Sequence, residues 1–261
     1  MPSTLSTFEQ AQGRESARKP VPSPSRAAGL KPGEPLVSLL SRESFEANMY
    51  RVLTHRIEHA GGPAAGRGVI AVTSPGAGEG KTTTAINLAG TLAQSKGSRV
   101  LLVDADLRLP GVSAQMGIPI DGHPGLADLI LDEHLPLDRA VRHFPTFNLS
   151  ILTSGRPPAG PYEALRSPRF GALLEQARRA YDYVIVDTPP VLPVPDCRAV
   201  ARWADRLLVV VAAHRTPRRY LEEALNALGP DKILGLVFNS VDPPRPGPYA
   251  YYRGYGAPPS R

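Results

Sequence analysis

Residues 73–89 read TSPGAGEGKTTTAINLA, and this stretch decides the fold. It follows the apolar run "GVIAVTS", typical of a buried strand, and leads into a segment whose apolar residues repeat at helical spacing. A glycine-rich turn between a strand and a helix predicts a phosphate-binding loop, because its backbone N–H groups point inward and the helix N-terminus attracts anions. In such a loop, Lys81 can neutralise β- and γ-phosphate oxygens and the Thr82 hydroxyl can coordinate Mg²⁺.

The loop departs from the strict P-loop pattern at one position, since Pro75 stands where a glycine is expected five residues before Gly80. The alternative is an ordinary glycine-rich turn that contains a lysine by chance. The strand before it, the helix after it and the sequence GKTT between them argue against that alternative. Lys81 is also one of only five lysines beside 25 arginines, so its presence here indicates a role that arginine does not fill.

Short runs rich in Val, Ile and Leu alternate with helical patterns along the chain from residue 68. Besides "GVIAVTS", these runs are "RVLLVDAD", "LSILTS", "YDYVIVDTP", "DRLLVVVAA" and "ILGLVFNS". Apolar residues recur at i, i+3, i+4 and i+7 in the segments that begin at Ala85, Phe170 and Leu221. The pattern predicts an α/β fold, a doubly wound, mostly parallel sheet whose strands are buried on both faces. Ligands of such sheets bind at the carboxyl ends of the strands.

The ends of the chain differ in composition from its centre. Residues 1–40 are rich in Pro, Ser and Arg and predict a disordered arm, whereas 41–241 predict the folded domain, with a first helix over 41–60. Residues 242–261 form a tail rich in Pro and Gly, in which no helix or buried strand is expected. This tail holds four of the nine tyrosines: Tyr249, Tyr251, Tyr252 and Tyr255.

Charge and composition exclude several classes of protein. The net charge is +6, of which residues 1–40 and 242–261 contribute +2 each, so the central 201 residues lack the basic surface of a dedicated nucleic-acid binder. Cys197 is the only cysteine, which excludes a disulfide framework. The chain begins without an apolar signal sequence, and its longest apolar run, "LLVVVAA", is far shorter than the ~20 residues of a membrane span. We therefore expect a cytoplasmic protein that reaches a membrane only through a partner.

Carboxylates follow two of the predicted strands. Asp104 and Asp106 end "VLLVDAD", and Asp187 ends "VIVD", the Walker B form. Near the phosphate loop such groups can hold Mg²⁺ or accept a proton from an incoming hydroxyl. Taken singly, an aspartate at a strand end is as readily a solvated turn or a helix cap. The order of P-loop, DAD and VIVD is much more specific than any of its parts.

These elements resemble the bacterial tyrosine kinases (BY-kinases) of polysaccharide synthesis, of the soluble CpsD/CapB-like kind. The match rests on "SPGAGEGKTTTAINLA" as Walker A, "LLVDADLRLPG" as Walker A′, "YDYVIVDTPP" as Walker B and the tyrosine-rich C-terminus. "PYEALRSPRF" and "ILGLVFNSVD" also look like family segments, so the resemblance covers about residues 41–255.

The resemblance implies an ATP- and Mg²⁺-dependent autokinase that phosphorylates its C-terminal tyrosine cluster in trans and regulates exopolysaccharide synthesis or export. It assigns Lys81, Asp104 and Asp106 to catalysis, and Thr82, Asp104 and Asp187 to the metal. It assigns the nucleotide to Gly76, Gly78, Glu79, Gly80, Lys81, Thr82, Thr83 and Asn239. It also implies a homo-oligomer and a separate membrane activator, a polysaccharide chain-length-determining protein.

The family's E-x-x-R-x-x-R motif in the first helix is incomplete here. Asn48 and Thr54 replace its outer residues and only Arg51 remains, which leaves the ring contact and the oligomer size open. Two other classes compete with the kinase. ParA/MinD-like partitioning ATPases share the GKTTT loop but carry a second lysine where this chain has Gly76. A non-catalytic ATP-dependent regulator would keep the same loop, and the paired aspartates with the tyrosine cluster favour chemistry instead.

Overall fold

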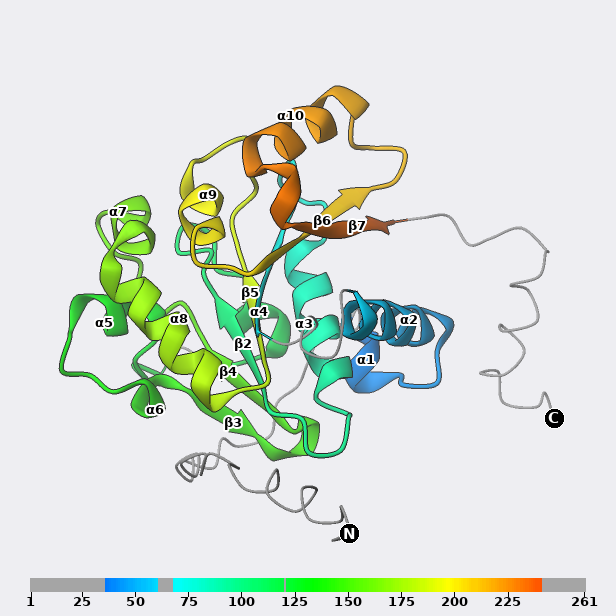
Figure 1. Cartoon of the computed structure of the whole chain (residues 1–261). Coiled ribbons are helices and arrows are strands. Elements are labelled where there is room, and N and C mark those ends of the chain that lie inside the picture. The colour runs from blue at the N-terminus through cyan, green and yellow to red at the C-terminus, as the bar shows by residue number, and fades with distance from the viewer. Residues whose placement is uncertain (1–35, 61–67, 120, 241–261) are drawn as a thin grey trace, which may run out of the picture.

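The computed structural model describes residues 36–60, 68–119 and 121–240 (Figure 1). The predicted arm up to residue 35, and the tail from 241 with all four clustered tyrosines, lie outside the described residues. The described part contains a seven-stranded sheet in the order β3-β4-β2-β5-β1-β6-β7. Its strands are β1 Gly68–Thr73, β2 Val100–Asp104, β3 Arg142–Phe144, β4 Leu149–Leu152, β5 Tyr183–Asp187, β6 Arg206–Ala212 and β7 Ile233–Asn239.

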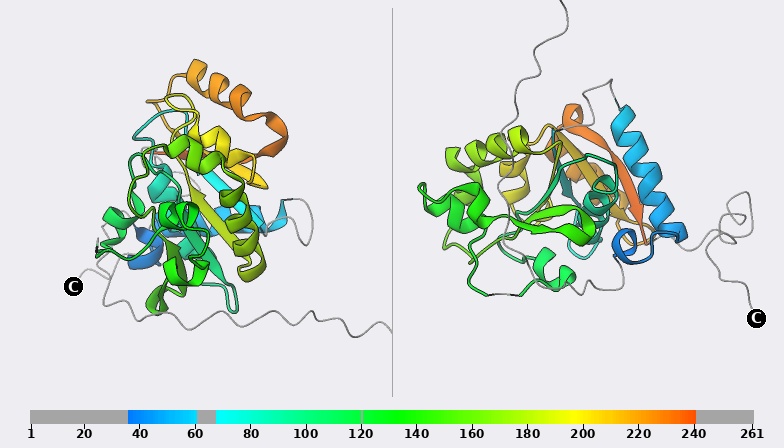
Figure 2. Two further views of the ribbon diagram at one scale, coloured as in Figure 1. Left: turned by 90° about the vertical axis from the view of Figure 1, so that its left-hand side faces the viewer. Right: turned by 90° about the horizontal axis from the view of Figure 1, so that it is seen from below.

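Helices cover both faces of this sheet (Figures 1 and 2). Helices α1 to α4 pack on one face and α5 to α9 on the other, each around its own apolar cluster. The helices are α1 Val37–Leu40, α2 Phe45–His59, α3 Lys81–Leu92, α4 Val112–Met116, α5 Leu126–Leu131, α6 Leu137–Ala140, α7 Pro161–Arg166, α8 Pro168–Ala180, α9 Asp196–Ala201 and α10 Arg218–Leu228. Two short 3₁₀ turns, η1 Pro145–Phe147 and η2 Pro230–Lys232, complete the described elements.

The central strands are apolar throughout because both of their faces are buried. In β1, Val69 and Ala71 point into the cluster beneath α5 to α9, whereas Ile70 and Val72 point into the cluster beneath α1 to α4. All described strand pairs are parallel except β3 with β4. The predicted doubly wound, mostly parallel α/β fold is confirmed.

Strand β7 departs from the prediction that every strand is buried on both faces. It lies at the edge of the sheet beside β6, and Phe238 is 60% exposed. A run of apolar residues identifies a strand, but it does not say whether the strand is central or at an edge, because the run contains no information on the order of strands.

The folded part begins earlier than the boundary predicted at residue 41. Leu36 and Leu39 are buried, and the Ser38 N–H donates a 2.9 Å hydrogen bond to Asn87 Oδ1 in α3. Leu39 lies directly over Gly90, where a β-carbon would collide with its side chain. These apolar contacts draw residues 36–40, expected to belong to the arm, onto α3.

The first predicted helix, expected over 41–60, is present as α2 over Phe45–His59. Ser44 caps its N-terminus by accepting a 3.0 Å hydrogen bond from the Ala47 N–H. Ala47, Thr54 and Ile57 are buried, whereas Met49 and Val52 are 41% and 48% exposed. No helix in the described ranges is both long and apolar enough to cross a bilayer.

Candidate active site

The phosphate loop joins β1 to α3 at the carboxyl edge of the sheet. Gly78 and Gly80 have φ angles of 73° and 92°, a left-handed conformation that glycine adopts without strain. Gly80 is the N-cap of α3, and the helix starts at Lys81. The first N–H groups of a helix have no partner within it, so the loop presents donors and a positive dipole end to an anion.

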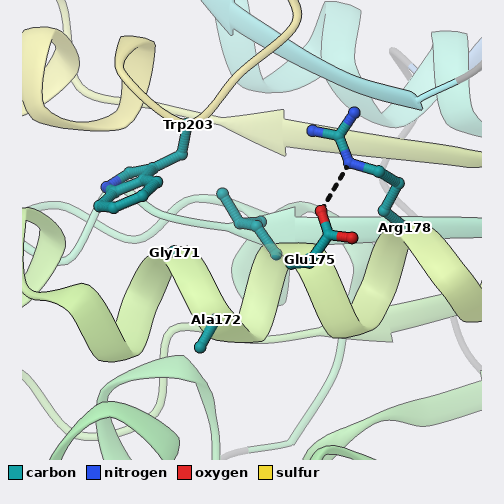
Figure 3. Close-up of a pocket in the computed structure, with 6 residues that line it drawn as sticks. Gly171, Ala172, Glu175, Arg178 and Trp203 are labelled. Atoms are coloured by element: carbon teal, nitrogen blue, oxygen red, sulfur yellow. Dashed lines mark ion pairs between the residues drawn. The ribbon is translucent and has the colours of Figure 1, made fainter.

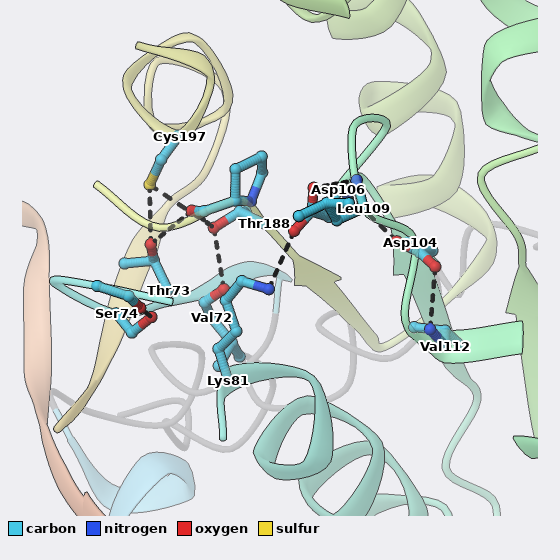
Figure 4. A network of polar contacts seen from close by, with 12 residues as sticks. Val72, Thr73, Ser74, Lys81, Asp104, Asp106, Leu109, Val112, Thr188 and Cys197 are labelled. Atoms are coloured by element: carbon cyan, nitrogen blue, oxygen red, sulfur yellow. Dashed lines mark hydrogen bonds and ion pairs between the residues drawn. The ribbon is translucent and has the colours of Figure 1, made fainter. Parts of the chain in front are cut away.

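The Lys81 side chain reaches from α3 to the loop after β2. Its Nζ donates a 3.0 Å hydrogen bond to Asp106 Oδ2, and the two side chains are only 14% and 4% exposed (Figure 4). Burial lowers the pKa of Lys81, but the charges of Asp187, Asp106 and Asp104 outweigh burial and raise it. Lys81 is therefore held as a cation in the middle of three carboxyl groups.

Asp104 is fully buried at the end of β2, where its carboxylate organises the turn that follows. Oδ1 accepts from the Asp106 N–H at 3.2 Å, and Oδ2 accepts from the Val112 N–H at 3.1 Å (Figure 4). Burial, followed by the charge of Asp187, raises the pKa of Asp104 well above its usual value. Asp106 in turn accepts a 3.0 Å hydrogen bond from the Leu109 N–H.

Asp187 is fully buried at the end of β5, and neither of its carboxylate oxygens has a hydrogen-bond partner among the described residues. Burial raises its pKa to about 6, although Lys81 lowers it. The Thr82 hydroxyl and the Thr188 N–H also lower this pKa, but neither reaches the geometry of a formed hydrogen bond; the Thr188 N–H donates to Val72 instead. Two unpartnered buried oxygens beside a threonine hydroxyl match the oxygen ligands that Mg²⁺ requires.

Glu79 and Asn239 form hydrogen bonds that hold the phosphate loop on the side away from the aspartates. Glu79 Oε1 accepts from the Gly76 N–H at 3.2 Å and from the Thr216 hydroxyl at 2.9 Å, and burial raises the pKa of this carboxyl group. Asn239, at the end of β7, donates from Nδ2 to the Glu79 carbonyl at 3.0 Å. Its amide lies so close to Gly80 that a β-carbon there would collide with it. Asn239, expected at the adenine, contacts the phosphate loop in this structure.

The structure brings all of the predicted phosphate-loop and aspartate residues to one edge of the sheet. It adds three residues to the surroundings of the site that sequence reasoning missed. Thr216 orients Glu79, and Arg108 Nε donates a 3.0 Å hydrogen bond to the fully buried Asp196 Oδ1. Arg108 stands two residues after Asp106 and was visible in the sequence, but its partner lies on α9, far along the chain. The pairing of Arg108 with Asp196 is therefore visible only in the folded structure.

A separate hollow of about 330 Å³ lies along α8 (Figure 3). Trp203 covers Gly171 on one side of it, and Glu175 pairs with Arg178 at 3.2 Å on the other. Because its two charged side chains neutralise each other and the phosphate loop is not part of its lining, this hollow is not the nucleotide site.

Comparison with known proteins agrees with this geometry. Residues 67–228 match the family model described as an AAA domain. Tyrosine-protein kinase YwqD of Bacillus subtilis is 34% identical over 83% of this chain and 90% of its own length. Tyrosine-protein kinase CpsD of Streptococcus agalactiae is 32% identical over 72% of this chain and 81% of its own. Succinoglycan biosynthesis transport protein ExoP of Rhizobium meliloti is 37% identical over 71% of this chain, but this covers only 24% of ExoP.

Solved structures also show similarity to bacterial tyrosine-kinase domains. The chimerical protein CapA2B2 superposes with a TM-score of 0.73 at 28% identity, covering 81% of this chain and 92% of that one. The kinase domain of Escherichia coli tyrosine kinase ETK has a TM-score of 0.73 at 27% identity, with 79% and 80% covered. Pyrococcus furiosus MinD, at 23% identity and a TM-score of 0.55 over 66% of this chain and 71% of its own, shares the fold. The chain belongs to the bacterial tyrosine kinases, an ATP-binding P-loop family related to capsule and exopolysaccharide synthesis.

Proposed function

We propose that this kinase transfers the γ-phosphoryl group of ATP to tyrosines in the C-terminal tail of a neighbouring copy. One observation carries the proposal: Lys81 lies among three buried aspartates at the carboxyl edge of the sheet, with its Nζ 3.0 Å from Asp106. Tyrosine is proposed as the acceptor because the chain belongs to the bacterial tyrosine kinases. The tyrosines proposed as acceptors are Tyr249, Tyr251, Tyr252 and Tyr255.

The phosphate loop would hold the triphosphate through backbone N–H groups and the α3 dipole. Lys81 would exchange its contact with Asp106 for the β- and γ-phosphate oxygens, and Thr82 would contribute its hydroxyl. Asn239 would shape the loop from the β7 side and contact the adenine. The residues proposed to contact nucleotide are Gly76, Gly78, Glu79, Gly80, Lys81, Thr82, Thr83 and Asn239.

Thr82, Asp104 and Asp187 would hold Mg²⁺, directly or through water. The fit rests on the two buried, unpartnered oxygens of Asp187 and on a donor set made only of oxygens. When bound, Mg²⁺ supplies neutralisation of phosphate charge. Burial, together with the charges of neighbouring aspartates, raises the pKa of Asp104 and Asp187, and a bound cation would offset both effects.

Asp106 is the aspartate best placed to accept the tyrosine proton. It lies beyond the strand end, and it becomes free to accept a proton once Lys81 turns to the phosphates. The tyrosine oxygen forms a bond to the γ-phosphorus as the bond from that phosphorus to the β–γ bridging oxygen breaks; ADP leaves and the phenolic proton passes to Asp106. Positioning and charge neutralisation supply most of the catalysis in such a reaction.

Phosphopeptide mass spectrometry of the tail tests the proposal on protein from its native host. Wild type is compared with Lys81→Ala, Asp106→Asn and the matched control Lys96→Ala, whose side chain is exposed beyond α3. We expect phosphotyrosine in wild type and in Lys96→Ala, and none in the other two. A bare tail in wild type from cells that are making polymer overturns the proposal. Retained ATP hydrolysis in that case would favour a nucleotide-dependent switch of the ParA/MinD kind.

Transfer between copies needs its own test, because β7 ends at Asn239 beside the phosphate loop of the same chain. The ten residues from there to Tyr249 span at most about 36 Å, long enough for a tyrosine to turn back to its own site. An active variant with its four tail tyrosines changed to phenylalanine is mixed with Lys81→Ala, whose tail is intact. We expect phosphate on the Lys81→Ala tail; a tail that stays bare while wild type is phosphorylated would show transfer within one chain.

We also propose that a separate membrane protein of polysaccharide transport activates the kinase and holds it at the inner face of the membrane. The support is that ExoP, a transport protein, is about four times as long as the part that matches this chain. Tail phosphorylation is compared with and without membranes from the native host, using protein purified from a host that lacks the transport system. Activity that does not rise with native membranes counts against an activator.

A further inference from the structure

The last two turns of α2 carry three side chains that ligate transition metals: His55, Glu58 and His59. One ligand atom from each lies within 4.8 Å of the others. Both histidines are exposed, and Glu58 is half-buried. Spacings of i, i+3 and i+4 put all three on one face of the helix. None of the phosphate-loop or aspartate residues is among them.

A hydrogen bond fixes the form of one ligand. His59 Nδ1 lies 2.7 Å from the His55 carbonyl oxygen. Because a carbonyl can only accept, Nδ1 must carry the proton, and Nε2 of His59 is then left with a free lone pair in the neutral ring. A backbone carbonyl that orients an imidazole in this way is the usual outer support of a metal-bound histidine.

The helix holds the three groups ready in position. Ser44 caps α2, and the buried residues Ala47, Thr54 and Ile57 anchor another face of the helix in the protein. The two imidazole rings already lie with their centroids 4.2 Å apart and tilted by 48°. Ligand atoms around a tetrahedral ion with bonds of about 2.0 Å are roughly 3.3 Å apart. The ligand atoms of the three side chains lie within 4.8 Å of one another, and rotation of these side chains can bring them to that separation.

We propose that α2 binds one divalent transition metal ion of the zinc, copper and nickel class through His55, His59 and Glu58. Imidazole nitrogens suit these ions, whereas Mg²⁺ prefers oxygen ligands alone. The α2 site therefore differs in chemistry from the all-oxygen site proposed beside the phosphate loop. Three ligands from one face leave at least one coordination position open to solvent.

Cobalt titration of the tag-free full chain tests the site, because Co²⁺ bound by nitrogen ligands absorbs visible light. A millimolar excess of Mg²⁺ occupies oxygen-only sites throughout. We expect one equivalent of Co²⁺ to produce a saturable band that Zn²⁺ displaces. Loss of a group that only hydrogen-bonds a metal ligand typically weakens metal binding by roughly 10–100-fold. His55→Ala and His59→Ala should each weaken Co²⁺ binding by more than this, and the double variant should abolish it. Glu58→Gln should weaken binding less than either histidine change.

His134→Ala is the matched control, since His134 is exposed on a different part of the structure beside Asp132. It should bind Co²⁺ as wild type does. Alanine favours helix more than histidine, so α2 is expected to fold in every variant, and circular dichroism checks this. Absence of a saturable band in wild type overturns the proposal. So does binding that survives the double variant, or that falls equally in His134→Ala.

Discussion

Asp104 and Asp187 are directly paired across two neighbouring strands: in the parallel register of β2 with β5, the Cα of one is the partner of the Cα of the other. Both side chains are fully buried. Two separate strand ends, far apart in the sequence, thus deliver their carboxyl groups to one point of the core. Folding concentrates negative charge there, and Lys81 approaches from the side of α3 to balance it.

The first prediction is that Asp187→Asn stabilises the nucleotide-free, metal-free protein at neutral pH. The pKa of Asp187 is raised to about 6 in the folded state from 3.8. Between these values the folded protein binds a proton that the unfolded chain does not, so stability falls as pH rises from about 4 to 6. The ionised carboxylate then costs about 3 kcal/mol at pH 7, which the asparagine removes.

Urea denaturation in EDTA at pH 7 and at pH 5 measures this effect. The free-energy gain of Asp187→Asn over wild type should be larger at pH 7 and should shrink at pH 5. Asp205→Asn, which removes a surface carboxylate paired with Arg178, is the control for a general effect of charge. A gain that is equal at both pH values would show that the buried carboxyl group is not the cause.

The second prediction is that Lys81 and Asp106 are coupled in stability. Lys81→Met leaves a buried carboxylate without its cation and should reduce the free energy of unfolding by roughly 3 kcal/mol. Adding Asp106→Asn to Lys81→Met should recover part of this loss, with a coupling energy of about 0.5–3 kcal/mol in the double-mutant cycle. Denaturation of the four proteins at pH 7 gives that energy. Strictly additive losses would mean that the 3.0 Å contact contributes nothing to folding.

The third prediction concerns Cys197, which lies under the site. Its Sγ is 3.1 Å from Thr73 Oγ1 and 3.6 Å from Thr188 Oγ1, and burial raises the pKa of this thiol. Both burial and a small thiolate fraction slow its reaction with disulfide reagents. The measurement is the rate at which a disulfide reagent labels Cys197 in the native protein and in urea. If the local opening that exposes the thiol costs about 3 kcal/mol, native labelling is ~100-fold slower than labelling in urea. Because Cys197 is the only cysteine, the absorbance change reports it alone, and complete native labelling at the denatured rate would contradict the buried position.

The sequence predicted much of the site because its chemistry is written in local patterns. The glycines of the phosphate loop, Lys81 and the strand-terminal aspartates each follow an element whose type is clear from periodicity. Their meeting point follows from the general rule that parallel strands end at one edge of the sheet. The assignments of individual roles to these residues stay predictions, as does the phosphorylation of the tail.

What the sequence could not predict depends on contacts between distant segments. Leu36 and Leu39 follow a proline-rich stretch and are buried in the same cluster as the apolar residues of α3, where Gly90 leaves room for the Leu39 side chain. The buried side of α2 could not be read from its apolar residues either, because Ala47 and Thr54 are buried while Met49 is 41% exposed. The partner of Arg108 was hidden for the same reason: Asp196 belongs to another element.

The last prediction isolates the contact between Asn239 and the phosphate loop. Gly80→Ala and Gly78→Ala both place alanine at a positive φ, which costs roughly 1–2 kcal/mol. Only at Gly80 does the new β-carbon also meet the Asn239 amide, since nothing lies within 4 Å of one at Gly78. Titration with a fluorescent ADP analogue should therefore show a larger loss of affinity for Gly80→Ala. Asn239→Ala in the same chain removes the colliding amide. The loss of affinity caused by Gly80→Ala should therefore be at least tenfold smaller in the Asn239→Ala background than in wild type. If Gly80→Ala costs as much affinity in the Asn239→Ala background as it does in wild type, backbone strain and not the Asn239 contact sets the shape of the loop.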